Sequence, residues 1–156
     1  MMCCKVPPIP ELGKPAARWC RHAAPGNGCG IYENRPQVCR RFYCHWMVDP
    51  ALGPEWKPDK AKFVMFPDPD CAEMYNVMVD PAFPDAWRRP PFFAAIESWV
   101  AAGATLGRFA LVHIGSRLSA VLPDRVVELG TVKPQFTLVR KRDLTGKIVA
   151  LRVRPD

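Results

Sequence analysis

Cysteine is the residue type in this chain whose number and position could support chemistry. The sequence has seven cysteines, and six of them lie within the first 44 residues. These six are Cys3, Cys4, Cys20, Cys29, Cys39 and Cys44. Thiolate sulfur is a preferred ligand of zinc, of iron in iron–sulfur clusters and of Cu(I). The concentration of cysteines therefore predicts a metal site in the first 48 residues, with these six side chains as its ligands.

The redox compartment decides between metal ligands and disulfide bonds. Residues 1–14 contain prolines and charges where a secretory signal needs an apolar stretch. No apolar run approaches the ~20 residues that a membrane-spanning helix requires. We therefore expect a cytoplasmic protein with no membrane partner, in a compartment where structural disulfides are rare. Metal ligation then explains the cysteines better than bridges do, while disulfides or buried thiols that cluster by chance stay open as alternatives.

The spacing of the cysteines does not identify the metal. Gaps of fifteen, eight, nine and four residues follow the Cys3-Cys4 pair. The Cys-x-x-Cys pairs of well-known zinc fingers and the spacing of bacterial ferredoxins are both absent. Adjacent side chains tend to point apart, so one of Cys3 and Cys4 would serve a second metal or the edge of a cluster. The natural ligands for one tetrahedral ion are then Cys20, Cys29, Cys39 and Cys44.

Several other residues near the cysteines could contribute to a metal site. His22 and His45 lie close to cysteines in the sequence and are candidate substitute ligands. Arg40 and Arg41 could offset the negative charge of a thiolate centre, although solvation is the simpler role for Arg41. Cys71, which is remote from the others, is best explained as a small buried thiol or an idle one.

The chain divides by composition into two parts, residues 1–48 and residues 49–156. Prolines and glycines interrupt any long helix or strand in the first part. Such a segment buries little apolar surface of its own, so a metal would have to staple it. The second part is richer in regular patterns, and we expect the two parts to pack as one compact unit.

Residues 49–156 predict an α+β fold, in which one main helix packs against a mostly antiparallel sheet. Strand-like stretches occur at residues 62–66 and 75–79. Apolar residues recur at helical spacing over residues 90–103. Two hairpins are predicted, one over residues 109–122 and a second over residues 136–153, which turns near residues 143–146.

The first hairpin also predicts which side chains share a face of the sheet. Gly115-Ser116 suits a two-residue turn, so Ile114 should pair with Arg117. That register places one set of apolar residues on one face, with His113 among them: Phe109, Leu111, Leu118, Ala120 and Leu122. A single histidine there is expected to have a structural role.

The residues around the cysteines resemble a known family. The motifs follow the order Cys3-Cys4-Lys5, Lys14-Pro15-Ala16, Trp19-Cys20, Cys29-Gly30-Ile31-Tyr32, Arg35-Pro36, Cys39-Arg40 and Phe42-Tyr43-Cys44. They resemble the zinc- or iron-chelating CxxCxxCC domain family, which is related to the cysteine domain of flagellin lysine N-methylase proteins. The resemblance covers about residues 3–48, and it implies that the cysteines chelate zinc or iron. Within it, Arg35-Pro36 is expected to shape the turn before Cys39.

The amino end departs from the family pattern, because the cysteine string begins at Cys3 and its earlier cysteines are missing. Either the protein lacks a ligand, or its true start lies upstream. We favour an upstream start, because Met1-Met2-Cys3-Cys4 would place a metal ligand on a fraying terminus.

These observations predict a thiolate metal-binding protein that holds zinc, iron or an iron–sulfur cluster and has no catalytic residues. Phosphate-binding glycine loops and the Gly-x-Ser-x-Gly elbow of hydrolases are absent. An iron–sulfur oxidoreductase, or an accessory to one, is the first alternative, and a protein that buffers Cu(I) or zinc is the second. The formal net charge of +7 permits contact with nucleic acid, but no block of like charges argues for it.

Overall fold

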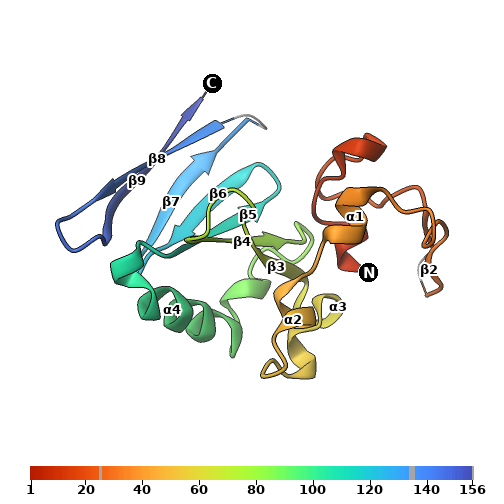
Figure 1. Cartoon of the computed structure of the whole chain (residues 1–156), viewed down its shortest axis with the longest axis horizontal. Coiled ribbons are helices and arrows are strands. Elements are labelled where there is room, and N and C mark those ends of the chain that lie inside the picture. Colours follow the sequence, from red (N-terminus) through yellow and green to blue (C-terminus); the bar gives the residue numbers. More distant parts are fainter. Residues whose placement is uncertain (25, 134–135, 156) are drawn as a thin grey trace.

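A mixed five-stranded sheet forms the centre of the molecule, and a separate two-stranded hairpin packs beside it (Figure 1). The computed structural model describes residues 1–24, 26–133 and 136–155. The sheet has the order β3-β4-β5-β6-β7. Its strands are β3 (Phe63–Pro67), β4 (Met74–Val79), β5 (Phe109–Ile114), β6 (Arg117–Val121) and β7 (Val126–Thr131). The separate hairpin consists of β8 (Phe136–Arg142) and β9 (Ile148–Pro155).

Short elements make up residues 1–61. The proline- and glycine-rich composition explains why none of them exceeds five residues in the described part of this segment. They are η1 (Met2–Cys4), η2 (Pro10–Leu12), β1 (Ala23–Ala24), β2 (Gly28–Cys29), α1 (Gln37–Arg41), α2 (His45–Val48), η3 (Pro54–Trp56) and α3 (Pro58–Ala61). The prediction that the cysteine-rich part has an irregular structure is confirmed.

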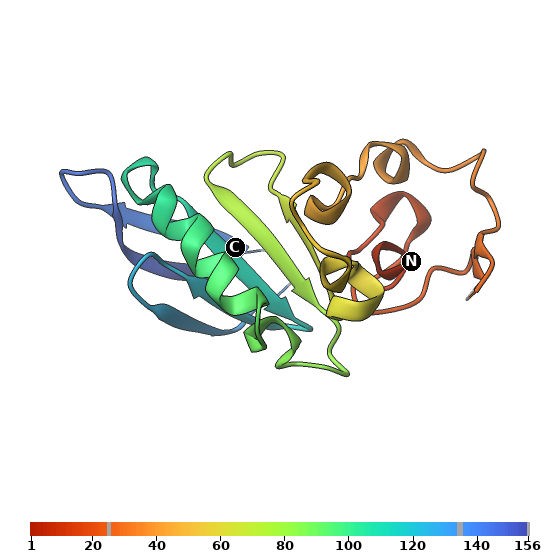
Figure 2. The ribbon, with the colours of Figure 1, turned by 90° about the horizontal axis from the view of Figure 1, so that it is seen from below.

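One face of the sheet is covered by α4 (Phe92–Ala102), which η4 (Ala86–Arg88) precedes and η5 (Ala104–Leu106) follows (Figure 2). Ile96 and Val100 of the helix are buried against Val112 of β5. Side chains alternate between the two faces of a strand, so the neighbours of Val112 point the other way. The apolar spacing over residues 90–103 thus predicted the helix and its buried face correctly.

The β8–β9 hairpin covers part of the opposite face. Ile148 and Leu151 of β9 pack there against a set of sheet residues: Phe109, Leu111, Leu118, Ala120 and Leu122. This is the set predicted to share one face, and Ile114 pairs with Arg117 as expected. The second hairpin turns at residues 143–146, where the Gly146 N–H donates to the Asp143 carbonyl at 3.1 Å.

The cysteine-rich segment packs on the same face at the β3 end of the sheet. Met2, Val6 and Cys44 form a buried cluster with Val64 of β3. Phe42, Phe66 and other half-buried apolar side chains surround this cluster. The start and the end of residues 1–48 are therefore anchored on one strand.

The α+β class is confirmed, but two features of the sheet were not predicted. β4 and β5 pair in parallel, so that β4, α4 and β5 form a crossover unit, while the other three pairs in this sheet are antiparallel. The edge strand β7 was missed, because its residues are mostly half-buried or exposed and give only a weak alternation.

The cluster between the sheet and the β8–β9 hairpin should contribute strongly to stability. We expect Leu118→Ala to lower the free energy of unfolding by about 2–5 kcal/mol, because a buried leucine leaves a cavity behind. Leu144→Ala is the matched control, since Leu144 is fully exposed and its loss should cost less than about 0.5 kcal/mol. Denaturant unfolding measures both values, and similar costs for the two variants would contradict this packing.

His113 should make stability depend on pH. Its Nε2 lies 3.1 Å from Asn76 Oδ1, and the Asn76 side chain donates to Asp68 at 2.8 Å. Burial lowers the pKa of His113 to about 4, whereas the pKa in the unfolded chain is about 6.5. The unfolded state therefore binds more protons between these values, so stability should fall as the pH drops from about 6.5 to about 4. Urea unfolding should show a smaller loss in His113→Gln, and an equal loss in both proteins would contradict the assignment.

Candidate metal centre

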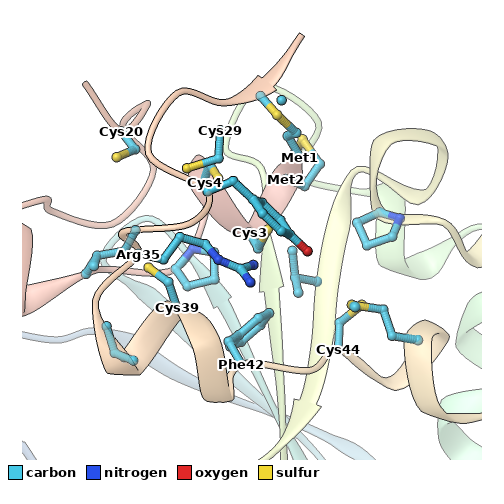
Figure 3. Close-up of a pocket in the computed structure, with 18 of the residues that line it drawn as sticks. Met1, Met2, Cys3, Cys4, Cys20, Cys29, Arg35, Cys39, Phe42 and Cys44 are labelled. Carbon is cyan, nitrogen blue, oxygen red and sulfur yellow. The ribbon is translucent and has the colours of Figure 1, made fainter. Parts of the chain in front are cut away.

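All six amino-terminal cysteines line a single cavity of about 340 Å³. The cavity lies between η1, the β2 region, α1 and the strand β3 (Figure 3). Its wall contains the complete predicted ligand set: Cys3, Cys4, Cys20, Cys29, Cys39 and Cys44. All seven cysteines of the chain are free thiols in this structure. The fold therefore brings together side chains that span 42 positions of the sequence.

Backbone hydrogen bonds place the first four of these cysteines. Cys3 and Cys4 lie on η1, and the Cys20 N–H donates to the Cys4 carbonyl at 2.8 Å. Cys29 lies on β2, where it pairs with Ala23 of β1. The short β1–β2 ribbon thus carries Cys29 back towards Cys20.

A proline positions Cys39, and packing on β3 positions Cys44. Pro36 directly precedes α1, and its carbonyl accepts a hydrogen bond from the Cys39 N–H at 3.0 Å. This is the turn that the Arg35-Pro36 pair was expected to shape. Cys44 directly precedes α2 and is buried in the cluster on β3.

Cys3 and Cys4 interact directly through their side chains. A hydrogen bond from Cys4 lowers the pKa of the Cys3 thiol to about 6. The same contact raises the pKa of Cys4, and burial and the negative charges of Cys3, Cys29 and Cys20 raise it further. The two adjacent thiols are therefore near enough for the ionisation of one to oppose that of the other.

The remaining thiols divide into a close group and one at the rim. Burial raises the pKa of Cys39 first, and nearby Cys20 and Cys29 raise it further. Burial also raises the pKa of Cys44, but among the thiols only Cys3 contributes to that shift. Figure 3 shows Cys44 beyond Phe42, apart from the other cysteines. The close group is thus Cys3, Cys4, Cys20, Cys29 and Cys39.

The side chains of the close group lie around an open volume and do not converge on one position. Within the described residues, no three Cys, His, Asp or Glu side chains converge tightly enough to hold one ion. A single tetrahedral zinc ion needs four sulfurs at about 2.3 Å from its centre. The donors have the right chemistry for a soft metal, but their arrangement is wider than a lone ion requires.

Lys14 is a buried cation beside the thiols. Its ammonium donates to the carbonyls of Lys5, Pro7 and Pro15 at 2.8, 2.5 and 3.0 Å. Burial lowers the pKa of Lys14, while negative charge on Cys20, Cys4 and Cys3 would raise it. Lys14 therefore ties down the loop after η1 and places a positive charge near the thiols.

The two candidate histidines lie away from this wall. Among the described residues that line the cavity, neither His22 nor His45 occurs. The His22 ring accepts a hydrogen bond from Arg21 at 3.2 Å. The His45 ring packs edge-on against Tyr75 and Trp99, with centroids 5.7 and 5.0 Å away. Neither ring supplies a ligand to the cavity in this arrangement.

The other candidates also have local partners. Arg40 donates to the backbone carbonyls of Arg35 and Glu33, so it braces the turn before α1. Cys71 lies far from the cavity, where its sulfur accepts a hydrogen bond from Arg140 at 2.9 Å. Cys71 is thus a half-buried thiol that packs beside the core and has hydrogen-bond partners.

Lys14 and Arg35 lie at the site but were not predicted from the sequence to belong to it. Both residues belong to the quoted motifs, yet we gave Arg35 only a turn-forming role and assigned no role to Lys14. Arg35 lines the cavity directly. Their positions among widely spaced cysteines are the signal that could have marked them.

Removing the Lys14 ammonium should loosen the amino-terminal loop. Lys14→Met leaves three carbonyls without this donor, and each unsatisfied group costs about 1–3 kcal/mol. Hydrogen exchange should therefore accelerate at the Ala17 and Cys20 amides, which bond to residues of this loop. Lys60→Met is the control, because Lys60 is exposed on α3. Unchanged exchange at both amides would show that Lys14 does not hold the loop.

Comparison of the chain with protein-family models, curated sequences and solved structures finds no match. The resemblance to the CxxCxxCC family therefore rests on the motifs quoted above. Across the described residues, no helix has the length and apolar character needed to cross a membrane.

Proposed function

We propose that this protein binds zinc, iron or an iron–sulfur cluster through the thiolates of its first 48 residues. One observation carries the proposal: six cysteines from five separate places in the segment line one cavity. Thiol side chains rarely gather in this way without a metal or a disulfide to use them, and all six are free thiols. The proposed role is that of a metal-binding module rather than of a catalyst.

The donor set favours soft metals over hard ones. Mg²⁺ and Ca²⁺ prefer oxygen ligands, whereas thiolates suit zinc, iron–sulfur clusters and Cu(I). Among the described residues that line the cavity, only Asp59 carries a carboxylate. A hard cation would therefore lack ligands here.

The size of the cavity favours a cluster over a single ion. The cavity that the thiols help to line has a volume of about 340 Å³, and no three of the described side chains converge on one point. An iron–sulfur cluster places several metal atoms and sulfides between its cysteines, so separated thiols can each reach a different iron. Cys4, Cys20, Cys29 and Cys39 are the preferred ligands in this form of the proposal. When bound, such a cluster supplies one-electron chemistry, so an iron–sulfur oxidoreductase or an accessory to one remains the alternative role.

A second candidate function is the buffering of Cu(I). Met1, Met2 and Met47 line the same cavity as the thiols. Thioether sulfur is a soft ligand that selects Cu(I), and zinc has no comparable use for it. This observation is the reason to include copper in the metal analysis.

Purification without air, followed by visible absorption and analysis of iron, sulfide, zinc and copper, tests the proposal. We expect a coloured protein with iron and sulfide in near-stoichiometric amounts, and a colourless, metal-poor Cys29→Ser, Cys39→Ser double variant. Cys71→Ser is the matched control, because Cys71 lies away from the cavity and the variant should keep its metal.

The outcomes separate the candidates. Zinc in a colourless protein would support a thiolate site that holds a single ion. Copper would favour the buffering of Cu(I). Metal content that is equally low in the wild-type protein and in the double variant would contradict the proposal.

A further inference from the structure

Arg35 introduces a charge into the thiol cavity that the protein itself does not neutralise. Its side chain extends from the turn before α1 into the middle of the ring of cysteines (Figure 3). Its Nε is shielded from solvent and has no hydrogen-bond partner in the described structure. Across the described residues, no carboxylate lies within ion-pair distance of its guanidinium.

Two neighbours hold Arg35 in this position. Its guanidinium carbon lies 3.7 Å from the centroid of the Tyr32 ring, a stacked arrangement that fixes the plane of the group. Arg40 donates to the Arg35 carbonyl at 2.9 Å and so fixes the backbone. These two contacts fix both the backbone and the side-chain direction of Arg35.

This arrangement is unfavourable unless something anionic joins it. Arg35 as a whole is half-buried, but its Nε is shielded from solvent, and a shielded donor without a partner is destabilising. A guanidinium cannot escape by losing its proton, because it stays protonated in proteins. Neutral thiols are weak acceptors and compensate little of this cost. Lys14 shows the contrast, because its three carbonyl acceptors satisfy it completely.

A metal bound by several thiolates would provide the missing negative charge. Four thiolates around Zn²⁺ carry a net charge of about −2 by ligand counting, and iron–sulfur clusters held by four cysteines are also anionic. Hydrogen bonds to the sulfurs of such a centre, together with nearby charge, are among the factors that set its reduction potential.

We propose that Arg35 is a positioning residue of the metal centre, whose Nε–H donates to a thiolate or sulfide sulfur and whose charge offsets that of the centre. This inference rests on the proposed function. It follows that Arg35 retains the metal and raises the reduction potential of a cluster. Its net contribution to the stability of the metal-free fold should be small, because the stack on Tyr32 offsets the Nε that has no partner.

The test compares Arg35→Gln with Arg41→Gln in protein reconstituted without air with Fe²⁺ and sulfide, and separately with Zn²⁺ alone. Arg41 is the matched control, because it is an exposed arginine of α1 in the same segment. Release to a chelator should be about ten- to a hundredfold faster in Arg35→Gln, as expected for the loss of a charge-assisted hydrogen bond. The midpoint potential of a cluster should fall in Arg35→Gln and stay unchanged in Arg41→Gln.

Thermal unfolding of the metal-free proteins provides the readout that a structural role would change. Arg35→Gln should unfold at about the same temperature as the wild type, because it removes the shielded Nε that has no partner together with the exposed stack on Tyr32. A lower unfolding temperature, or release and potential equal to those of the wild type, would overturn the role of Arg35. If the wild-type protein takes up neither Fe²⁺ with sulfide nor Zn²⁺, it is the proposed function itself that fails.

Discussion

The packing of Met2, Val6 and Cys44 against Val64 of β3 is the interaction on which the candidate site depends. The described residues of the segment 1–48 form no long helix or strand that could bury a core by itself. Their first and last turns are instead fixed to the same strand of a sheet that has two cores of its own. The chain between these anchors must return to its starting point, and this return encloses the thiol cavity. The geometry of the site is therefore a consequence of where a proline-rich segment meets the sheet.

Within this loop, two cations differ in whether their hydrogen-bond donors have acceptors. Lys14 is satisfied by three carbonyls, and it would hold the loop whether or not the thiols are ionised. Arg35 has a stacking partner but no acceptor for its buried Nε in the described structure. Both lie among cysteines whose pKa values respond to one another's negative charge. Ionising several of these thiols together is costly, and a bound metal with nearby positive charge reduces that cost.

The sequence predicted the elements with a strong periodicity and missed those without one. The hairpin register followed from Gly115-Ser116, and the buried face of α4 followed from apolar spacing. The parallel pairing of β4 with β5 could not be read from local pattern, because it depends on α4 crossing over the sheet. β7 is an edge strand whose half-buried side chains show little alternation.

The site was predictable as a set of residues but not as an arrangement. Residue type and motif order were enough to select the six cysteines that line the cavity. Cys44 was chosen from its spacing in the sequence as one of four ligands for a single ion. The structure buries Cys44 against β3, apart from the other five cysteines. The inward direction of Arg35 depends on its stacking with Tyr32, which the Arg-Pro motif alone did not indicate.

The anchoring of the segment also bears on how metal binding would relate to folding. Small zinc domains fold only with their metal, so the binding energy is consumed in ordering the chain. Here packing on β3 and the Lys14 hydrogen bonds hold the wall of the cavity in place. A ligand that enters such a preformed cavity has less disorder to overcome, so more of the interaction energy is expressed as affinity. The Arg35 Nε would favour binding too, because an anionic centre would give this shielded donor the acceptor that it lacks in the described structure.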